Sequence, residues 1–157
     1  MNYWNRKAMR DQLEEKMRSL RGLDPAFVPA KGWIRSIRDA LGLSARQLGR
    51  NVGIDQSRVS RLENAEVAGN LKLSSLQKIA KGMNMRFVYG FVPEKPMEEL
   101  VRGQARAIAS VKLKALHEAM AKEQQGLSQE EQDIVLNDMI EMILFKQPRN
   151  FWDKSAS

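Results

Sequence analysis

One stretch of the chain decides the fold, Ala45-Arg46-Gln47-Leu48-Gly49-Arg50-Asn51-Val52-Gly53-Ile54-Asp55-Gln56-Ser57-Arg58-Val59-Ser60-Arg61-Leu62. Its residue types suit two short helices that cross closely. The first helix needs a small residue, Gly49, where it faces the second, and Gly53 suits a turn with a positive φ. Four apolar residues can hold both helices on a shared core: Leu48, Val52, Val59 and Leu62. The pattern predicts a helix over 45–51, a turn over 53–55 and a second helix over 56–62.

The second helix carries polar side chains that can read base pairs. The major groove of DNA admits an α-helix and presents a distinct pattern of donors and acceptors at each base pair. Gln56 can pair with N6 and N7 of adenine, and Arg58 or Arg61 can fork onto O6 and N7 of guanine. Ser57 can serve a base or a phosphate. The pattern therefore predicts a helix-turn-helix that reads double-stranded DNA. The alternative for each residue is a backbone contact, because most protein–DNA hydrogen bonds go to phosphate and sugar.

A second set of polar residues is predicted to contact phosphates, because the first helix of such a motif crosses the DNA backbone. Arg46, Gln47 and Arg50 lie on that first helix. Asn64 and Lys72 follow the recognition helix and can contact the flanking phosphates, and Arg38 completes the set. If Glu63 folds back against Arg38, the pair becomes a charge-assisted hydrogen bond that also aims Arg38 at a phosphate. An unrelated surface pair is the alternative. The residues predicted to have structural roles are Gly49, Gly53, Val59, Leu62 and Glu63.

The positive charge of the chain is concentrated around this motif. The 157 residues carry a formal net charge of +7, and residues 31–82 contain ten basic and four acidic side chains, a net of +6. Residues 83–157 carry a net of −1. Such a distribution is typical of a surface that binds a polyanion. A basic surface that is merely solvated is the alternative.

The rest of the chain reads mainly as helix. Apolar spacing predicts helices over 5–23, 32–41, 74–81, 96–124 and 128–145, and Ser128 with Glu131 forms a capping box for the last of them. Aromatic and β-branched residues over 85–92 predict a short strand. Three parts are expected: an N-terminal helix and connector over 1–30, a DNA-binding domain over 31–93 that ends in the strand, and a C-terminal helical extension over 94–157.

The central residues resemble the Xre/phage-repressor helix-turn-helix family. The family's Leu-Glu-Asn-Gly hallmark appears here as Leu62-Glu63-Asn64-Ala65, so Asn64 is expected to adopt the positive φ that glycine would take. Gln56 and Arg38 also match the family's pattern. The resemblance implies a mainly α fold: a five-helix, lambda-repressor-like domain with a short β-strand and a C-terminal helical extension.

Three segments are similar to the "mobile mystery protein A" family: residues 31–42, residues 86–93, and Phe151-Trp152-Asp153. This resemblance implies a small bacterial regulator from mobile DNA, encoded beside a Fic-domain protein, and an antitoxin-like role as a hypothesis. Some Fic inhibitors carry Ser/Thr-x-x-x-Glu-Gly/Asn. In this chain Val59 stands four residues before Glu63, so that motif is absent.

Other classes of function find little support in the sequence. Cysteine is absent, His117 is the only histidine, and no apolar run approaches the roughly 20 residues of a membrane span. We expect no catalysis, no metal, no cofactor and a cytoplasmic protein. The expected partners are an inverted-repeat operator and a second copy of the chain. A protein-interaction module is the alternative, with helices 97–124 and 128–145 as a dimer or partner surface, or with segment 85–92 pairing across a two-fold axis. The sequence does not reveal the operator sequence, whether the protein represses or activates, or the role of residues 1–30.

Overall fold

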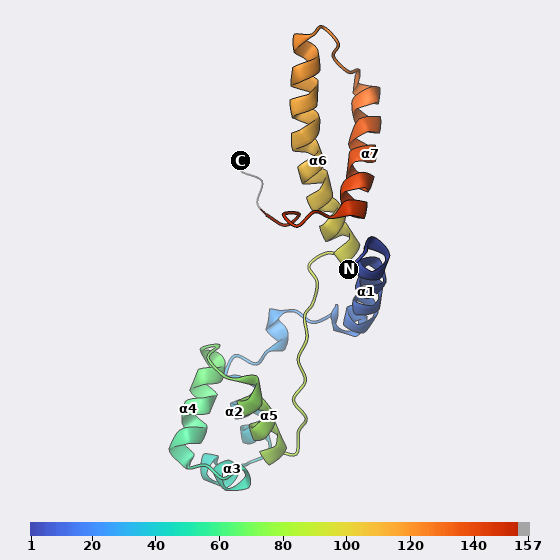
Figure 1. The fold of residues 1–157 in the computed structure, drawn as a ribbon. Helices are drawn as coiled ribbons and strands as arrows, with labels where there is room; N and C mark the ends of the chain where they lie inside the picture. The colour runs from blue at the N-terminus through green and yellow to red at the C-terminus, as the bar shows by residue number, and fades with distance from the viewer. Residues whose placement is uncertain (154–157) are drawn as a thin grey trace. The chain divides into compact units, whose positions relative to one another are not determined.

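The structure is a computed structural model that describes residues 1–153, and within them it contains seven α-helices and no β-strand (Figure 1). The helices are α1 (Tyr3–Met17), α2 (Trp33–Ala40), α3 (Ala45–Val52), α4 (Gln56–Val67), α5 (Leu73–Gly82), α6 (Met97–Lys122) and α7 (Gln129–Lys146). Two short 3-10 helices lie at Arg18–Leu20 and Pro25–Phe27. The predicted mainly α fold is confirmed.

The chain folds as two compact units. One unit is Gly22–Phe91 and contains α2 to α5. The other joins Met1–Arg21 to Val92–Ser157, of which the structure describes the part up to Asp153, and it contains α1, α6 and α7. Each unit has its own hydrophobic core, so each is described by itself.

The unit Gly22–Phe91 packs four helices around a small core. The core residues come from all four helices and the turn after α5: Ile34, Leu48, Val59, Ile79 and Met83. Leu48 and Val59 are fully buried, which confirms that the two helices of the central motif share a core. Val52 and Leu62, the other two predicted core residues, are half-buried against it.

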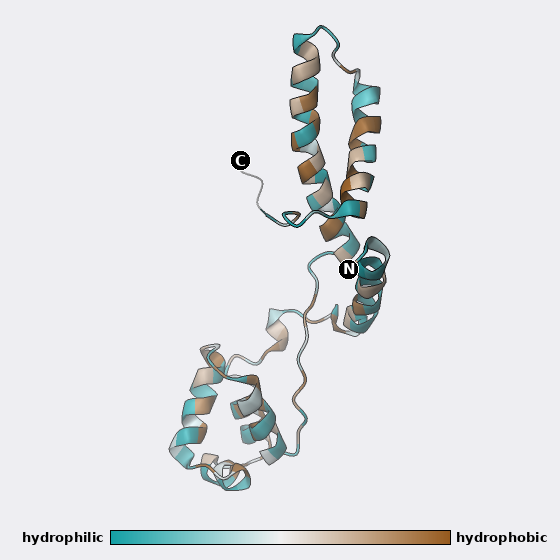
Figure 2. Cartoon of the chain, viewed as in Figure 1, coloured by the Kyte–Doolittle hydropathy of each residue, from teal (hydrophilic) through white to brown (hydrophobic). Residues whose placement is uncertain are grey.

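The other unit is built on a helical hairpin of α6 and α7 (Figure 1). Ala105 and Ala109 are fully buried, because small side chains on α6 let the two helices approach closely. After α7, Phe151 returns to the core with 1% exposure, and its carbonyl oxygen accepts a hydrogen bond from Gln104 Nε2 over 2.6 Å. Figure 2 shows apolar residues along both helices of the hairpin. Helix α1 packs against α6 and α7, so the N-terminal helix belongs to this unit.

A capping box is present at the start of α3 and at the start of α7. The Ser128 hydroxyl accepts from the Glu131 amide, and the Glu131 carboxylate accepts from the Ser128 amide over 2.8 Å. This confirms the predicted start of α7. Ser44 and Gln47 form the same arrangement at the start of α3.

Three expectations about the fold are wrong. Residues 85–92 form no strand in the described chain, because no neighbouring segment offers backbone groups for a ladder. The helix-turn-helix unit has four α-helices and not five, because α1 packs with α6 and α7. Asn64 does not adopt a positive φ, because α4 continues through it to Val67 and Gly69 (φ +74°) turns the chain instead.

Candidate nucleic-acid interface

Gly49 of α3 packs directly against the turn that leads into α4. A Cβ on this residue would lie 2.5 Å from the carbonyl oxygen of Ile54, so only glycine fits here without a shift of the backbone. The Ile54 amide donates to the Gly49 carbonyl oxygen over 2.9 Å and closes the turn. Gly53 adopts the left-handed conformation, with φ +74°. The positive φ predicted for Gly53 is confirmed. The predicted need for a small residue at Gly49 is confirmed too, but this residue faces the turn before α4 and not α4 itself.

The start of α4 is fixed by a cap that the sequence reading did not identify. Asp55 precedes the helix, and its carboxylate accepts from the Arg58 amide over 2.7 Å. Aspartate is among the preferred N-cap residues, so its position before Gln56 was a readable signal. The cap holds the first turn of α4, which carries Gln56, Ser57 and Arg58.

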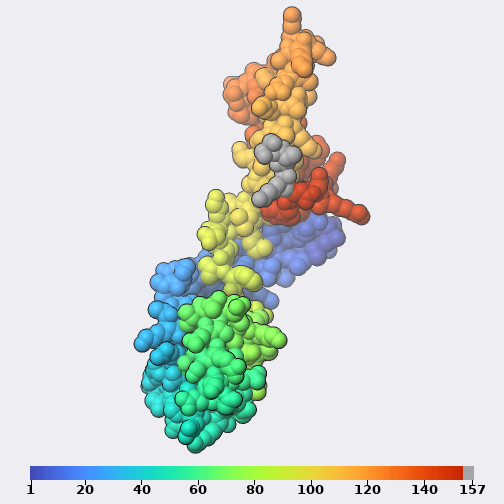
Figure 3. All heavy atoms as spheres, turned by 90° about the vertical axis from the view of Figure 1, so that its left-hand side faces the viewer, coloured from blue at the N-terminus to red at the C-terminus, as the bar shows by residue number. Residues whose placement is uncertain are grey.

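The polar side of α4 faces outward. Gln56, Ser57, Arg58 and Arg61 are exposed, whereas Val59 between them is fully buried. None of the four side chains makes a hydrogen bond or ion pair with another residue of 1–153. Helix α4 lies at the left of its unit in Figure 1 and faces the viewer in Figure 3, with no other segment in front of it. The four predicted base-reading residues therefore share one open surface, and their contacts with bases stay a prediction.

The predicted phosphate contacts fall into two groups. Arg46, Arg50, Asn64 and Lys72 are exposed. Gln47 is exposed as well, but its Oε1 accepts from the Ser44 amide over 2.8 Å, and both N–H groups of its carboxamide remain available as donors. Arg38 is different because its side chain is only 13% exposed.

Arg38 and Glu63 form the predicted pair, and the contacts of Arg38 hold its guanidinium group inside the domain. Arg38 Nε donates to Glu63 Oε1 over 2.6 Å, and a second nitrogen lies 3.4 Å from Oε2. The third nitrogen donates to the Leu43 carbonyl oxygen over 2.9 Å and lies 3.0 Å from Asp39. The hydrogen bond with Glu63 raises the pKa of Arg38 above its ordinary value. The pair locks α2 to α4, and the aim at a phosphate stays a prediction.

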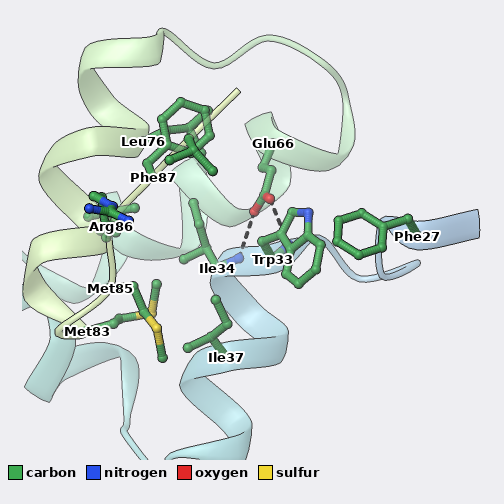
Figure 4. Close-up of a pocket in the computed structure, with 13 residues that line it drawn as sticks. Phe27, Trp33, Ile34, Ile37, Glu66, Leu76, Met83, Met85, Arg86 and Phe87 are labelled. Atoms are coloured by element: carbon green, nitrogen blue, oxygen red, sulfur yellow. Dashed lines mark hydrogen bonds between the residues drawn. The ribbon is translucent and has the colours of Figure 1, made fainter. Parts of the chain in front are cut away.

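Glu66 performs a role that the sequence reading missed. Its two carboxylate oxygens accept from the amides of Trp33 and Ile34 over 2.7 and 3.0 Å, so it caps the start of α2 from α4 (Figure 4). The residue before α2 is Gly32, which has no side chain to do this. No local pattern could reveal a cap that lies more than 30 residues along the chain. Asn51 was missed for the same reason: its side chain donates to the Gly82 carbonyl oxygen at the end of α5.

The electrostatics of this unit follow from these contacts. Its acidic residues over 31–82 all serve the fold: Asp39 and Glu63 pair with Arg38, Asp55 caps α4, and Glu66 caps α2. Eight of the ten cations form no ion pair with any residue of 1–153: Lys31, Arg46, Arg50, Arg58, Arg61, Lys72, Lys78 and Lys81. The surface is therefore positive with little internal compensation, which favours a polyanion as its ligand.

Among residues 1–153, no three His, Cys, Asp or Glu side chains gather in a way that could hold a metal ion. No helix in that part of the chain combines the length and apolar character that a bilayer span requires.

Comparison with known proteins agrees with this geometry over the central unit. Residues 34–89 match a protein-family model described as Helix-turn-helix. This part of the chain is therefore a helix-turn-helix domain of the Xre type, as the sequence predicted. No curated protein and no solved structure matches the chain.

Proposed function

We propose that this chain is a sequence-specific double-stranded DNA-binding regulator of transcription that acts as a dimeric repressor. The single observation that supports this most strongly is the start of α4. There Gln56, Ser57 and Arg58 project outward from a capped first turn, on a unit whose acidic side chains are all used internally. The first residues of a recognition helix are those that reach base edges in the major groove.

In this proposal α4 enters the groove with its exposed side. Gln56 pairs with an adenine, Arg58 forks onto a guanine, and Arg61 reads a base or grips a phosphate further along. Each good bidentate pair contributes about 1–3 kcal/mol of discrimination against the wrong base.

Helix α3 crosses the sugar-phosphate backbone. Arg46 and Arg50 neutralise phosphates, and Gln47 donates its remaining N–H groups to a phosphate oxygen while its carbonyl oxygen stays in the capping box. Arg38 acts one step removed from DNA: it holds α4 through Glu63 and so sets the angle at which the helix enters the groove.

Two copies related by a two-fold axis would place two α4 helices in successive major grooves of an inverted repeat. The centres of the half-sites are then about 34–36 Å apart, or a multiple of that distance. A dimer bound over a promoter would exclude RNA polymerase.

The test begins with selection of bound duplexes from a random DNA pool, which does not require the natural operator. Binding of the selected duplex is then measured by fluorescence anisotropy for the wild type and for the Gln56→Ala/Arg58→Ala variant. We expect the variant to lose discrimination between selected and scrambled duplexes. The matched control, Arg106→Ala/Gln125→Ala, removes the same residue types from exposed positions in the other unit and should keep it. Retained discrimination in the first variant would refute the assigned reading surface.

A second candidate function is partner binding by the unit that contains α6 and α7. Trp4, Met142 and Phe145 are 66%, 53% and 60% exposed there. The Tyr3 ring lies between Trp4, edge-to-face at a centroid distance of 5.0 Å, and Phe145, tilted at 5.8 Å. Exposed aromatic clusters are typical of protein interfaces. Together with the resemblance to the mobile mystery protein A family, this supports an antitoxin-like role toward a Fic-domain protein.

Isothermal titration with a Fic-domain protein tests the second candidate. A Trp4→Ser/Phe145→Ser variant should lose binding, while Gln56→Ala/Arg58→Ala should keep it. Equal binding by the wild type and the first variant would exclude this surface.

A further inference from the structure

An apolar pocket of about 390 Å³ opens on the helix-turn-helix unit. Its wall is formed by Phe27, by Trp33 and Ile37 of α2, and by three residues at and after the end of α5, Met83, Met85 and Phe87 (Figure 4). The rings of Phe27 and Trp33 lie 5.2 Å apart at its rim. Water in such a pocket would find few polar partners, so the site favours an apolar occupant.

The segment that follows α5 is extended and lacks backbone partners. Residues 86–91 make no backbone hydrogen bond within the described chain, although they are rich in residues that favour strands. Three large apolar side chains on it are strongly exposed: Val88 (73%), Tyr89 (67%) and Phe91 (81%). An unpaired apolar segment of this kind is a template for pairing with another chain.

The aromatic rings of the segment share one side, which begins at the pocket and continues beyond it. The rings of Phe87 and Tyr89 lie on the same side, 6.0 Å apart and nearly parallel, as residues i and i+2 of an extended chain should. Met85 and Phe87 line the pocket, and the backbone between and after them brings Arg86 and Val88 to its lining as well. The same alternation assigns Phe91 to this face, where Tyr89 and Phe91 are left uncovered by their own unit.

We propose that two copies of the chain pair antiparallel through residues 85–91, with the two-fold axis at Val88. In this register Phe87 of each copy lies opposite Tyr89 of the other, and Met85 lies opposite Phe91. Opposite residues in an antiparallel pair share a face, so the second copy's Phe91 covers the pocket beside Met85. Both pockets are filled in the same way, as the symmetry of a two-fold dimer requires.

The residue pattern suits a second copy because the segment is complementary to itself in this register. Arg86 falls opposite Gly90, which leaves space for the longer side chain. The two Arg86 residues are offset by four positions, or about 13 Å, so their charges lie far apart. No acidic residue lies within 85–91 to attract a basic partner of another kind.

The area is in the range that a stable dimer needs. Scaled by their exposures, two tyrosines and two phenylalanines present roughly 450–750 Å², at about 150–250 Å² per ring. The surfaces that they cover lose a similar area, so these rings alone bury roughly 900–1,500 Å², against about 1,200–2,000 Å² for a specific interface. Val88 and the new backbone pairing add to this.

The register can be tested by disulfide cross-linking, since the chain has no natural cysteine. In Val88→Cys the two thiols lie opposite each other across the axis, where Cβ atoms are about 4.5–5.5 Å apart. In the matched control, Arg86→Cys, they lie about 13 Å apart, beyond the reach of a disulfide. Oxidation with copper phenanthroline should convert Val88→Cys to a covalent dimer and leave Arg86→Cys monomeric on a denaturing gel. Equal cross-linking of both variants, or none of Val88→Cys, would overturn the register.

Sedimentation tests whether this face holds the dimer. Tyr89→Ser/Phe91→Ser changes only exposed residues, so it should fold and sediment as a monomer at a concentration where the wild type is a dimer. The control Met142→Ser/Phe145→Ser removes exposed apolar residues from α7 and should stay dimeric. If Met142→Ser/Phe145→Ser were monomeric and Tyr89→Ser/Phe91→Ser stayed dimeric, the dimer interface would lie on α7. If the wild type were monomeric at every concentration, the occupant of this face would be a different protein. Either outcome refutes the proposal.

The inference rests on the dimer of the proposed function, but its test uses no DNA. If DNA selection succeeds and Val88→Cys does not cross-link, only the interface is wrong. If the cross-link forms and no duplex is selected, the interface stands and the proposed function fails.

Discussion

The Ile54 amide donates to the carbonyl oxygen of Gly49, and the Ile54 carbonyl oxygen lies 2.5 Å from the point where a Cβ on Gly49 would stand. The two residues therefore fix the turn from both sides: a hydrogen bond holds it closed, and the close approach permits no side chain. The crossing of α3 and α4, and with it the direction of the outward side of α4, depends on this contact.

Replacing Gly49 by alanine should destabilise the helix-turn-helix unit, since the atom that it meets is backbone and cannot move aside. We expect a loss of about 1–3 kcal/mol, as for other overpacked sites. Gly103→Ala in α6 is the control: a Cβ there meets nothing within 4 Å, so helix propensity should stabilise the chain by about 0.5–1 kcal/mol. Urea denaturation followed by circular dichroism measures both. A Gly49→Ala variant as stable as the wild type would contradict the close approach.

Arg38→Ala should cost about 3–5 kcal/mol of unfolding free energy, because it leaves the 8% exposed carboxylate of Glu63 without its partner. The double variant Arg38→Met/Glu63→Leu should recover much of that loss, since neither charge then remains buried. Arg35→Ala is the control: its pair with Asp39 is exposed and 3.9 Å long, and it should contribute less than about 1 kcal/mol. If Arg38→Ala were as mild as Arg35→Ala, the pair would not lock α2 to α4.

Phosphate and base contacts should separate in their dependence on salt. Arg46→Ala should weaken binding to all duplexes alike and reduce the slope of log K against log salt by about 1, because one fewer phosphate is neutralised. Arg58→Ala should cost about 1–3 kcal/mol at one position of the selected site and relax specificity there. Anisotropy titrations at several salt concentrations, on selected and single-mismatch duplexes, distinguish the two. If Arg46→Ala and Arg58→Ala changed affinity and salt dependence equally on every duplex, the assignment of α3 to phosphates and α4 to bases would be wrong.

Mild acid should weaken the unit that contains α6 and α7. Hydrogen bonds from the Met97 and Ser128 amides hold the pKa values of Glu14 and Glu131 below their ordinary value of 4.5. A carboxyl group whose pKa is lower in the folded state stabilises that state above its unfolded pKa, and this stabilisation disappears as the pH falls through the folded pKa. Urea midpoints should therefore fall below about pH 5. Glu14→Gln should show a shallower fall, and an unchanged pH dependence in that variant would exclude Glu14 as a contributor.

Local signals in the sequence predicted the parts of the fold that local chemistry determines. Gly49, Gly53 and the Ser128 capping box act within a few residues of themselves, and each is confirmed. The predicted strand shows the limit of this reasoning. Residues 85–92 have the composition of a strand, but a strand also needs a neighbour, and composition does not say whether the same chain supplies one.

The features that were missed join residues far apart in sequence. Helices α2 and α6 have no side-chain cap of their own, since Gly32 precedes α2 and Pro96 precedes α6. Glu66 and Glu14 supply these caps from other helices. Periodicity identifies which side of a helix is apolar, but it does not reveal which distant carboxylate will reach an amide. The packing of α1 on α6 and α7 is hidden from sequence for the same reason.

Helix α4 presents Gln56 and Arg58 outward, while Glu63 and Glu66 on the same helix hold α2 in place. A genetic screen for lost repression should therefore return two classes of mutant from these twelve residues. Outward substitutions would leave normal amounts of protein that no longer recognises the operator. Substitutions at Glu63 or Glu66 would lower the amount of folded protein in the cell, and their defect should recede at a lower growth temperature.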